Sequence, residues 1–402
     1  MNISPKQRFL DICHFKRPGE LCMLGGFINI LSEQTLEEWG KQGAPKEITS
    51  PRFCRDYFQI QHIHWLGEIK SGALGRSAWA VGEEVRPTID LGHGILVRVE
   101  GGVIIPAYEF KLISEDEHTI TFRTGNGQTR KMLKDNPFRM PTFLDWPVKD
   151  KATWKEHKKR LDPNTPKRWP ADWNTYVHEM NKKSEPLSLE VGSFYGFLRE
   201  WVGTERILYM FYDDPGLIED MMDTMLHLEI EIIKRALKDI KVEQATFWED
   251  MCYKAGPLIS PAMVRKFMMP RYKKITDLLH SYGVDVIYLD SDGNIEQLIP
   301  LWLEAGINFI WPFEVAAGND AVTMRKKYGK DLIIGGAIDK RALIKGKEAI
   351  REEVMSKVPF LLEQGGYFPS VDHVVPPDVT FENYCYFINT MREVAGLEKL
   401  SF

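Results

Sequence analysis

From residue 186 to residue 402, short apolar runs alternate with longer amphipathic stretches. The apolar runs are typical of buried strands, and they lie at residues 187–192, 245–249, 284–290, 307–312, 332–336 and 367–371. The stretches between them have helical spacing, at roughly residues 194–212, 214–240, 260–282, 294–305, 319–329, 346–364 and 380–395. This alternation predicts a parallel sheet covered by helices.

The number of strands indicates which parallel fold this is. Six strands are predicted in this part, and the first 90 residues have room for two more. Eight strands with intervening helices predict an α/β fold of the (β/α)8 TIM-barrel type. No glycine-rich phosphate-binding turn follows the first of these strands, which argues against a dinucleotide-binding fold. In such a barrel the residues just past the strand ends form the active site.

The chain before residue 186 has a different pattern. Residues 4–16 predict a short helix with Ser4 as N-cap and Pro5 at its first position, and residues 36–40 suggest another. Two-residue alternation then predicts strands at 94–99, 103–105 and 119–123, with glycine-rich turns between them. We expect an antiparallel β insertion or cap. The predicted parts are 1–90 (N-terminal helices and first barrel elements), 91–140 (β insertion) and 141–402 (barrel body).

Composition narrows the classes of partner and compartment. The 402 residues include 52 Lys and Arg against 57 Asp and Glu, a net charge of −5, and no basic stripe interleaves with aromatics. Nucleic acid is therefore not expected as a partner. No apolar run is long enough to span a membrane, and no export leader is seen. The five scattered cysteines predict neither disulfides nor a thiolate cage, so we expect a cytoplasmic protein.

Four polar residues follow three of the predicted strands: Asp290, Asp292, Glu314 and His373. Because parallel strands end at one rim, these side chains are expected to converge on one pocket. Clustered carboxylates are unfavourable without a metal ion or shared protons. Oxygen and nitrogen donors without sulfur fit zinc, or a harder ion such as manganese or magnesium. The alternative is that the aspartates cap a helix, while Glu314 and Asp372 make structural hydrogen bonds.

A second group of candidates surrounds this rim. Glu249 and Asp250 end another predicted strand, where they could act as acid, base or substrate contact, or merely cap the next turn. Tyr195, Trp248 and Trp311 are candidates for binding a flat aromatic substrate, although aromatic residues are also common core filler.

Four sequence segments carry a family resemblance: Leu289-Asp290-Ser291-Asp292-Gly293-Asn294, Gly335-Gly336-Ala337-Ile338-Asp339-Lys340, Gly365-Gly366-Tyr367-Phe368-Pro369-Ser370-Val371-Asp372-His373 and Pro376-Pro377-Asp378-Val379. Through them the chain resembles the uroporphyrinogen decarboxylase superfamily, and in particular its corrinoid-dependent methyltransferase branch. The resemblance implies a (β/α)8 barrel, which agrees with the strand count.

The resemblance also implies chemistry. Thiol-methylating relatives hold zinc with a His-x-Cys pair, a Glu and a final Cys. Asp290, Asp292, Glu314 and His373 fill these positions here, so a thiol acceptor is not implied. A zinc site of carboxylates and imidazole is a harder Lewis acid, suited to the oxygen of a methyl ether.

The expected function is therefore removal of a methyl group from a methoxylated aromatic, a methoxyphenol or methoxybenzoate. The methyl group would pass to the Co(I) corrinoid of a separate corrinoid-binding protein. Glu249, Asp250 and His373 are the predicted catalytic residues. A metal-free decarboxylase is the alternative, although residues 21–27 lack the arginines that bind a polycarboxylate substrate in that enzyme. A barrel that binds a corrinoid or porphyrin without chemistry is a third reading, and a homodimer is one assembly the chain could form.

Overall fold

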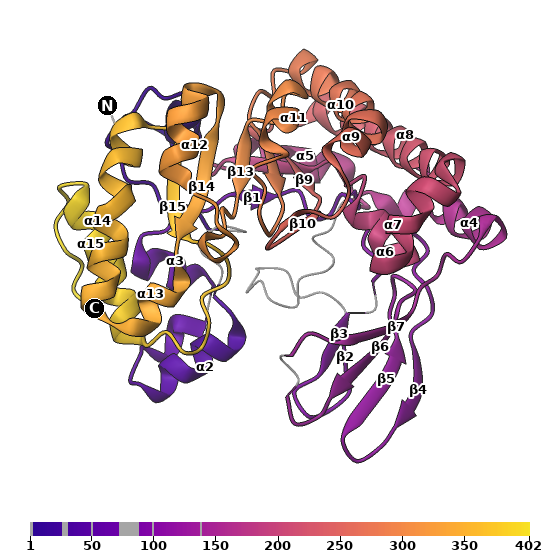
Figure 1. Cartoon of the computed structure of the whole chain (residues 1–402), viewed down its shortest axis with the longest axis horizontal. Coiled ribbons are helices and arrows are strands. Elements are labelled where there is room, and N and C mark those ends of the chain that lie inside the picture. Colours follow the sequence, from indigo (N-terminus) through magenta and orange to yellow (C-terminus); the bar gives the residue numbers. More distant parts are fainter. Residues whose placement is uncertain (1–2, 26–30, 50, 72–87, 99, 137–138) are drawn as a thin grey trace.

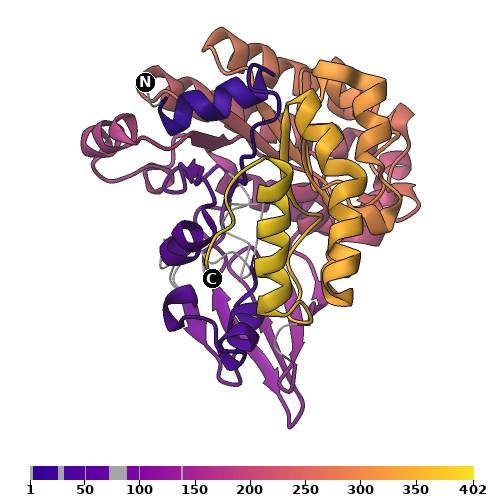
Figure 2. The same cartoon turned by 90° about the vertical axis from the view of Figure 1, so that its left-hand side faces the viewer.

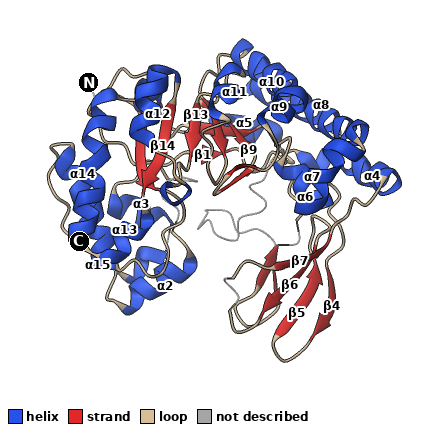
Figure 3. Cartoon of the chain, in the orientation of Figure 1, coloured by secondary structure: helices blue, strands red, loops and turns tan. Residues whose placement is uncertain are grey.

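The computed structural model describes the chain except for residues 1–2, 26–30, 50, 72–87, 99 and 137–138. Seven parallel strands form a curled sheet at its centre (Figures 1 and 3). In spatial order they are β1 (His64–Trp65), β8 (Leu187–Glu190), β9 (Gln244–Trp248), β12 (Ile287–Asp290), β13 (Phe309–Trp311), β14 (Ile333–Ile338) and β15 (Tyr367–Val371). The six strands predicted after residue 186 are all present.

Described residues before and after 26–30 pair with both edges of this sheet. Leu24 makes an isolated parallel bridge with Gln61, just before β1, and Leu31 makes one with Val375, just after β15. Leu24 and Leu31 therefore lie against opposite edges of the seven-stranded sheet. The predicted (β/α)8 barrel is confirmed.

Helices lie outside the sheet (Figure 3). In chain order these helices are α6 (Gly196–Val202), α7 (Thr204–Asp213), α8 (Pro215–Asp239), α9 (Pro261–Met263), α10 (Met269–Ser281), α11 (Ile299–Glu304), α12 (Ala321–Tyr328), α13 (Lys340–Lys345), α14 (Lys347–Gln364) and α15 (Phe381–Val394). The longest of them, α8, buries twelve residues, among them Leu217, Met221 and Leu228. A π-helical turn, Val264–Met268, joins α9 to α10 within the predicted helix 260–282.

The first helix, α1 (Pro5–Cys13), closes the end of the barrel where the strands begin. Ser4 caps it and Pro5 starts it, as the sequence predicted. Phe9 stacks on Phe368 of β15 with ring centroids 5.5 Å apart, inside an apolar cluster that also contains Phe309. Figure 2 shows this helix beside the N-terminus, with the β insertion at the opposite end of the molecule. The other early helices are α2 (Glu33–Lys41), α3 (Pro51–Phe58), α4 (Lys151–Lys158) and α5 (Trp173–Lys182).

The antiparallel insertion predicted from two-residue alternation is present. It contains the pair β2 (Thr88–Asp90) and β3 (Leu96–Arg98), and the sheet β4 (Lys111–Glu115), β5 (Thr119–Arg123), β6 (Thr129–Leu133) and β7 (Thr142–Asp145). The strand predicted at 103–105 was wrong. Val103 and Ile104 are buried in the main core, and the Val103 carbonyl accepts from Arg168 Nη1 at 2.9 Å instead of from a strand.

Among the described residues, none of the helices combines the length and the apolar character that a membrane crossing requires.

Candidate active site

The strand ends of β9 and β12 lie against each other at the rim of the barrel. The amides of Glu249 and Asp250 both donate to the Asp290 carbonyl, at 2.9 and 3.2 Å. Parallel register also aligns Asp290 with Trp248 on one side and with Trp311 on the other. Residues that lie far apart in the sequence therefore share one edge of the sheet.

The four residues predicted as metal ligands come from three such loops and act on one another. His373 Nε2 lies 3.5 Å from Asp292 Oδ2. Glu314 accepts from the Gly293 amide at 2.8 Å, and its second oxygen lies 3.9 Å from Lys340 Nζ. The structure thus brings the predicted cluster together.

Asp290 and Asp292 differ in charge although they are two residues apart. Burial raises the pKa of Asp290 well above its ordinary value, and the charges of Asp292, Asp250 and Glu314 raise it further. Burial also acts to raise the pKa of Asp292, but its bond to His373 and the nearby positive charges hold that pKa below its ordinary value. Two carboxyl groups with opposite shifts are the arrangement by which enzymes separate a proton donor from an ionised partner.

His373 carries the charge that balances Asp292. Burial acts to lower its pKa, but the bond to Asp292 and the charge of Asp292 raise it above the ordinary value. Its ring also stacks on Trp311, with centroids 5.9 Å apart and planes 19° apart. Trp311 therefore orients the His373 ring, and the Asp292 carboxylate favours its protonated form.

Asp250 is held by an arginine that the sequence did not single out. Arg199, on α6, donates from Nη2 to the Asp250 carboxylate at 2.5 Å and from Nη1 to the Asp250 carbonyl at 2.7 Å. Burial raises the pKa of Asp250, and Asp292 adds to this, although Arg199 acts in the opposite direction. The guanidinium also lies 5.5 Å from the ring centre of Trp248.

Glu249 occupies a different environment from the one expected of a catalytic acid. It is fully buried, and five donors surround its two carboxylate oxygens at 2.7–3.3 Å: the hydroxyls of Ser193 and Tyr272 and the amides of Phe194, Tyr195 and Gly196. These contacts tie the start of α6 to the end of β9. They support an anchoring role, and they give its predicted catalytic role no support.

The three predicted substrate-binding aromatics all belong to this rim. Tyr195 and Trp311 are buried, and Trp248 is partly exposed. The Tyr195 hydroxyl and Trp311 Nε1 have no hydrogen-bond partner among the described residues. Buried donors without a protein partner are rare in folded proteins, and they are groups that a ligand or an ordered water can satisfy. Both belong to the rim at which Asp290 lies.

The fit of this cluster to a zinc ion can be tested on its geometry. Within the described ranges, no three His, Cys, Asp or Glu side chains are grouped as metal ligands would be. Glu314 is engaged by Gly293 and Lys340, and Asp292 by His373. The arrangement as it stands does not fit a zinc site, and zinc stays a prediction.

Sequence reasoning missed two residues at this rim, Arg199 and Lys340. Lys340 lies inside a motif that carries the family resemblance, so the signal was present but unused. Asp372 was weighed only as a structural residue, and its carboxylate does accept from the amides of Val315 and Lys340. Arg199 lies on a helix with no distinguishing local pattern, and only its contact with Asp250 reveals it.

Residues 196–394 match a family model described as uroporphyrinogen decarboxylase (URO-D). This segment belongs to the uroporphyrinogen decarboxylase family. It spans the barrel from α6 to α15 and contains every residue of the site except Tyr195.

A solved structure and the curated proteins complete the comparison. A methyltransferase from Methanosarcina mazei is similar in structure over 98% of this chain and 99% of its own, with a TM-score of 0.54 and 14% identity. At that identity the likeness shows the fold alone. No curated protein matches the chain in sequence.

Proposed function

We propose that this protein is a methyltransferase that removes a methyl group from a methoxylated aromatic, such as a methoxyphenol or methoxybenzoate. The methyl group passes to the Co(I) corrinoid of a partner protein. The observation that carries the proposal is the buried Asp290, whose pKa is raised, beside the ionised pair Asp292–His373. Its support is the family of residues 196–394 and the shared fold with a methyltransferase.

The transfer needs an acid because phenoxide is a poor leaving group. The bond between the ether oxygen and the methyl carbon breaks, and its electron pair stays on oxygen. Co(I) supplies the electron pair of the new cobalt–carbon bond and is thereby formally oxidised to Co(III). Asp290, whose pKa is raised by burial and by the neighbouring carboxylates, would give its proton to the oxygen, so that a neutral phenol leaves.

The remaining rim residues would bind and orient the donor. The Tyr195 hydroxyl and Trp311 Nε1 are buried donors without partners in the described part of the chain, available to an oxygen of the substrate. Trp248 and Trp311 would offer flat apolar faces to the ring. The Asp292–His373 pair would keep Asp290 protonated, because a second ionised carboxylate beside Asp292 is disfavoured.

The direct test combines the protein with a reduced corrinoid protein and a panel of methoxylated aromatics. The proposal expects the spectrum of methyl-cobalt(III) to appear together with one equivalent of the phenol. The matched control is Asp290→Asn, which keeps the size of the side chain but removes its acidic proton. An absence of methyl-cobalt with every donor and partner tested would reject the proposal.

Elemental analysis tests whether the acid route needs a metal such as the zinc that the sequence predicted. The acid route expects less than about 0.1 zinc per active chain. One zinc per chain, lost together with activity in Asp292→Asn, would instead establish the metal and replace the role given to Asp290.

A metal-free decarboxylase is the other candidate function. The match of residues 196–394 to uroporphyrinogen decarboxylase and the cluster of four carboxyl groups favour it. Release of CO2 from an aromatic or porphyrinogen acid, without any corrinoid partner, would select this alternative over methyl transfer.

A further inference from the structure

Asp372 is a buried carboxylate that lies between the loops of the candidate site. It follows β15 directly and is 1% exposed. Its amide donates to the Ile338 carbonyl of β14 at 2.7 Å, so the pairing of these strands continues by one residue. The next residue in the chain is His373.

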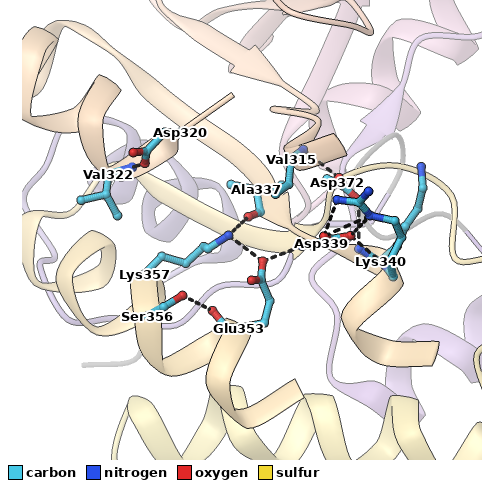
Figure 4. Close-up of polar contacts among 12 residues, drawn as sticks. Val315, Asp320, Val322, Ala337, Asp339, Lys340, Glu353, Ser356, Lys357 and Asp372 are labelled. Carbon is cyan, nitrogen blue, oxygen red and sulfur yellow. Dashed lines mark hydrogen bonds and ion pairs between the residues drawn. The ribbon is translucent and has the colours of Figure 1, made fainter. Parts of the chain in front are cut away.

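Both oxygens of Asp372 accept hydrogen bonds from the backbone of neighbouring loops. Oδ2 accepts from the Val315 amide at 2.8 Å, and Oδ1 accepts from the Lys340 amide at 3.1 Å (Figure 4). Val315 follows Glu314 in the loop after β13, and Lys340 begins α13 after β14. One carboxylate therefore joins the loops after three consecutive strands.

The side chains on these loops meet at the site. Lys340 Nζ lies 3.9 Å from Glu314 Oε1, and the charges of both act on Asp292 or His373. A shift of either loop would change the field around Asp292 and, through it, around Asp290. The backbone bonds of Asp372 hold this distance constant.

The loop after β14 has a second support on its outer side. Glu353 Oε1 accepts from the Asp339 amide at 2.7 Å and from Lys357 Nζ at 2.5 Å, and Lys357 also donates to the Ala337 carbonyl at 3.1 Å (Figure 4). The turn is thus fixed from outside by α14. On its inner side, Asp372 links it to the Val315 amide, in addition to the Lys340–Glu314 ion pair and the bond from the Ala337 amide to the Pro312 carbonyl at 3.2 Å.

We propose that Asp372 is a positioning residue, which sets Glu314, Lys340 and His373 relative to one another for the reaction. The kinetic part of this inference rests on the proposed function. A carboxylate is required because both of its oxygens accept, whereas an amide offers one acceptor and would turn an N–H₂ group toward an N–H donor.

The test is Asp372→Asn, measured by hydrogen exchange and by kinetics. Peptides that contain Val315 and Lys340 should exchange at least about tenfold faster, because one amide loses its acceptor. The kcat for methyl transfer should fall about 10- to 100-fold, while KM for the donor stays within about threefold. Unchanged exchange in both peptides, or an unchanged kcat, would overturn the proposal.

The matched control is Asp320→Asn. Asp320 also accepts from two backbone amides, those of Val322 and Thr323 at 2.9 and 3.1 Å, but both bonds go to Oδ1 and lie within the first turn of α12, so they join no two rim loops. Asparagine is a good N-cap, so kcat should be unchanged. A loss of kcat in this variant equal to that of Asp372→Asn would show a general effect on stability and reject the positioning role.

A second variant approaches the same bond from the donor side. Val315→Pro removes the backbone N–H that donates to Asp372 Oδ2, and it changes no charged side chain. Glu314 has φ −59° and ψ 112°, an extended conformation that tolerates a following proline. The variant should reproduce the fall in kcat, and normal kinetics would contradict the proposal. If the wild-type protein transfers no methyl group, the proposed function fails, and exchange at Lys340 still decides whether Asp372 holds the loops.

Discussion

Single carboxyl groups at the barrel rim differ in charge because their surroundings differ. Asp290 and Asp292 belong to one short segment, yet only Asp292 contacts His373. Burial acts on both, so the partner determines which keeps a proton. The position of His373 thus assigns the two roles.

The pH dependence of activity should follow Asp290. Because its folded-state pKa is raised, the proton it donates is present below that pKa and is lost as the pH rises through it. Initial rates of methyl transfer should therefore fall on the alkaline side in the wild type. Asp290→Asn should lower the rate at least about 100-fold and remove this alkaline limb from what remains. An Asp290→Asn rate equal to that of the wild type would exclude the acid role.

Asp290→Asn should lower the rate but raise the stability of the fold at alkaline pH. A raised pKa contributes stability that is fully present below the unfolded-state pKa and is lost as the pH rises through the folded-state value. Asp290→Asn removes this loss, so at pH 8 it should raise the free energy of unfolding by about 1 kcal/mol, and the gain should disappear near pH 4. Urea unfolding at both pH values measures this. A variant that is less stable than the wild type at pH 8 would contradict a raised pKa of Asp290.

Among the elements, strand β14 shows how close packing shapes the sheet near the rim. Gly336 has φ +86°, and a Cβ there would lie 2.2 Å from the Pro312 carbonyl oxygen. The strand end therefore passes directly over the end of β13. The Gly335-Gly336 pair in the family motif has its physical reason in this approach.

Gly336→Ala should destabilise the protein by about 3 kcal/mol or more, because backbone strain and a clash with a backbone atom add. Gly346→Ala is the control, since Gly346 also has positive φ (106°) but a Cβ added there would meet no atom within 4 Å. That variant should cost about 1 kcal/mol from φ strain alone. Equal losses in thermal or urea unfolding would refute the packing argument.

The β insertion is attached to the barrel through a buried histidine. The Tyr108 hydroxyl contacts His157 Nδ1 of α4 at 2.9 Å, and His157 is fully buried. Burial, with the charge of Arg160, lowers the pKa of His157 to about 3. The neutral ring is therefore part of the joint between the two elements.

Acid should loosen this joint. A lowered histidine pKa contributes stability that is present above the unfolded value of 6.5 and is lost as the pH falls toward the folded value of about 3. Between pH 8 and pH 5 the wild type should lose about 2 kcal/mol through this group. In urea unfolding, the free energy of unfolding of His157→Gln should therefore fall by about 2 kcal/mol less than that of the wild type over the same pH range. An identical pH dependence in both proteins would show that His157 is charged or exposed in solution.

The whole molecule has two different ends. Helix α1 fills the end where the strands begin, and the insertion lies toward the other (Figure 2). The rim also carries the hairpin β10 (Cys252–Tyr253) and β11 (Gly256–Pro257), and Tyr253 is 51% exposed. We therefore expect the corrinoid of the proposed partner to approach Asp290 from the rim side.

A bound corrinoid partner should slow hydrogen exchange at the rim, in peptides that contain Tyr253 and Lys340, and leave α1 unchanged. A change of at least about threefold at the rim is expected, because the partner covers the loops there. A catalytically incompetent partner without corrinoid serves as the control for contacts of the protein alone. Protection confined to α1 would contradict the proposed direction of approach.

The local pattern of apolar and polar residues was sufficient to predict the barrel and to locate the rim where its strands end. Short apolar runs with helical spacers have only a few packing solutions, so the six strands from 187–192 to 367–371 and the candidates at their ends followed from periodicity. The prediction of a strand at 103–105 was wrong because an apolar run can also be a buried segment without regular structure. Here the carbonyl of Val103 accepts a hydrogen bond from Arg168.

The states of these candidates depend on residues far away in the chain. Asp292 is ionised through His373, 81 positions later, whereas Glu249 is occupied by Ser193 and Tyr272 from two helical connections. The charge of a carboxyl group depends on its distance to other charges and on the exclusion of water. Neither quantity can be predicted from the local pattern of the sequence. Which carboxyl group holds a proton, and which merely anchors a helix, therefore follows from packing in three dimensions.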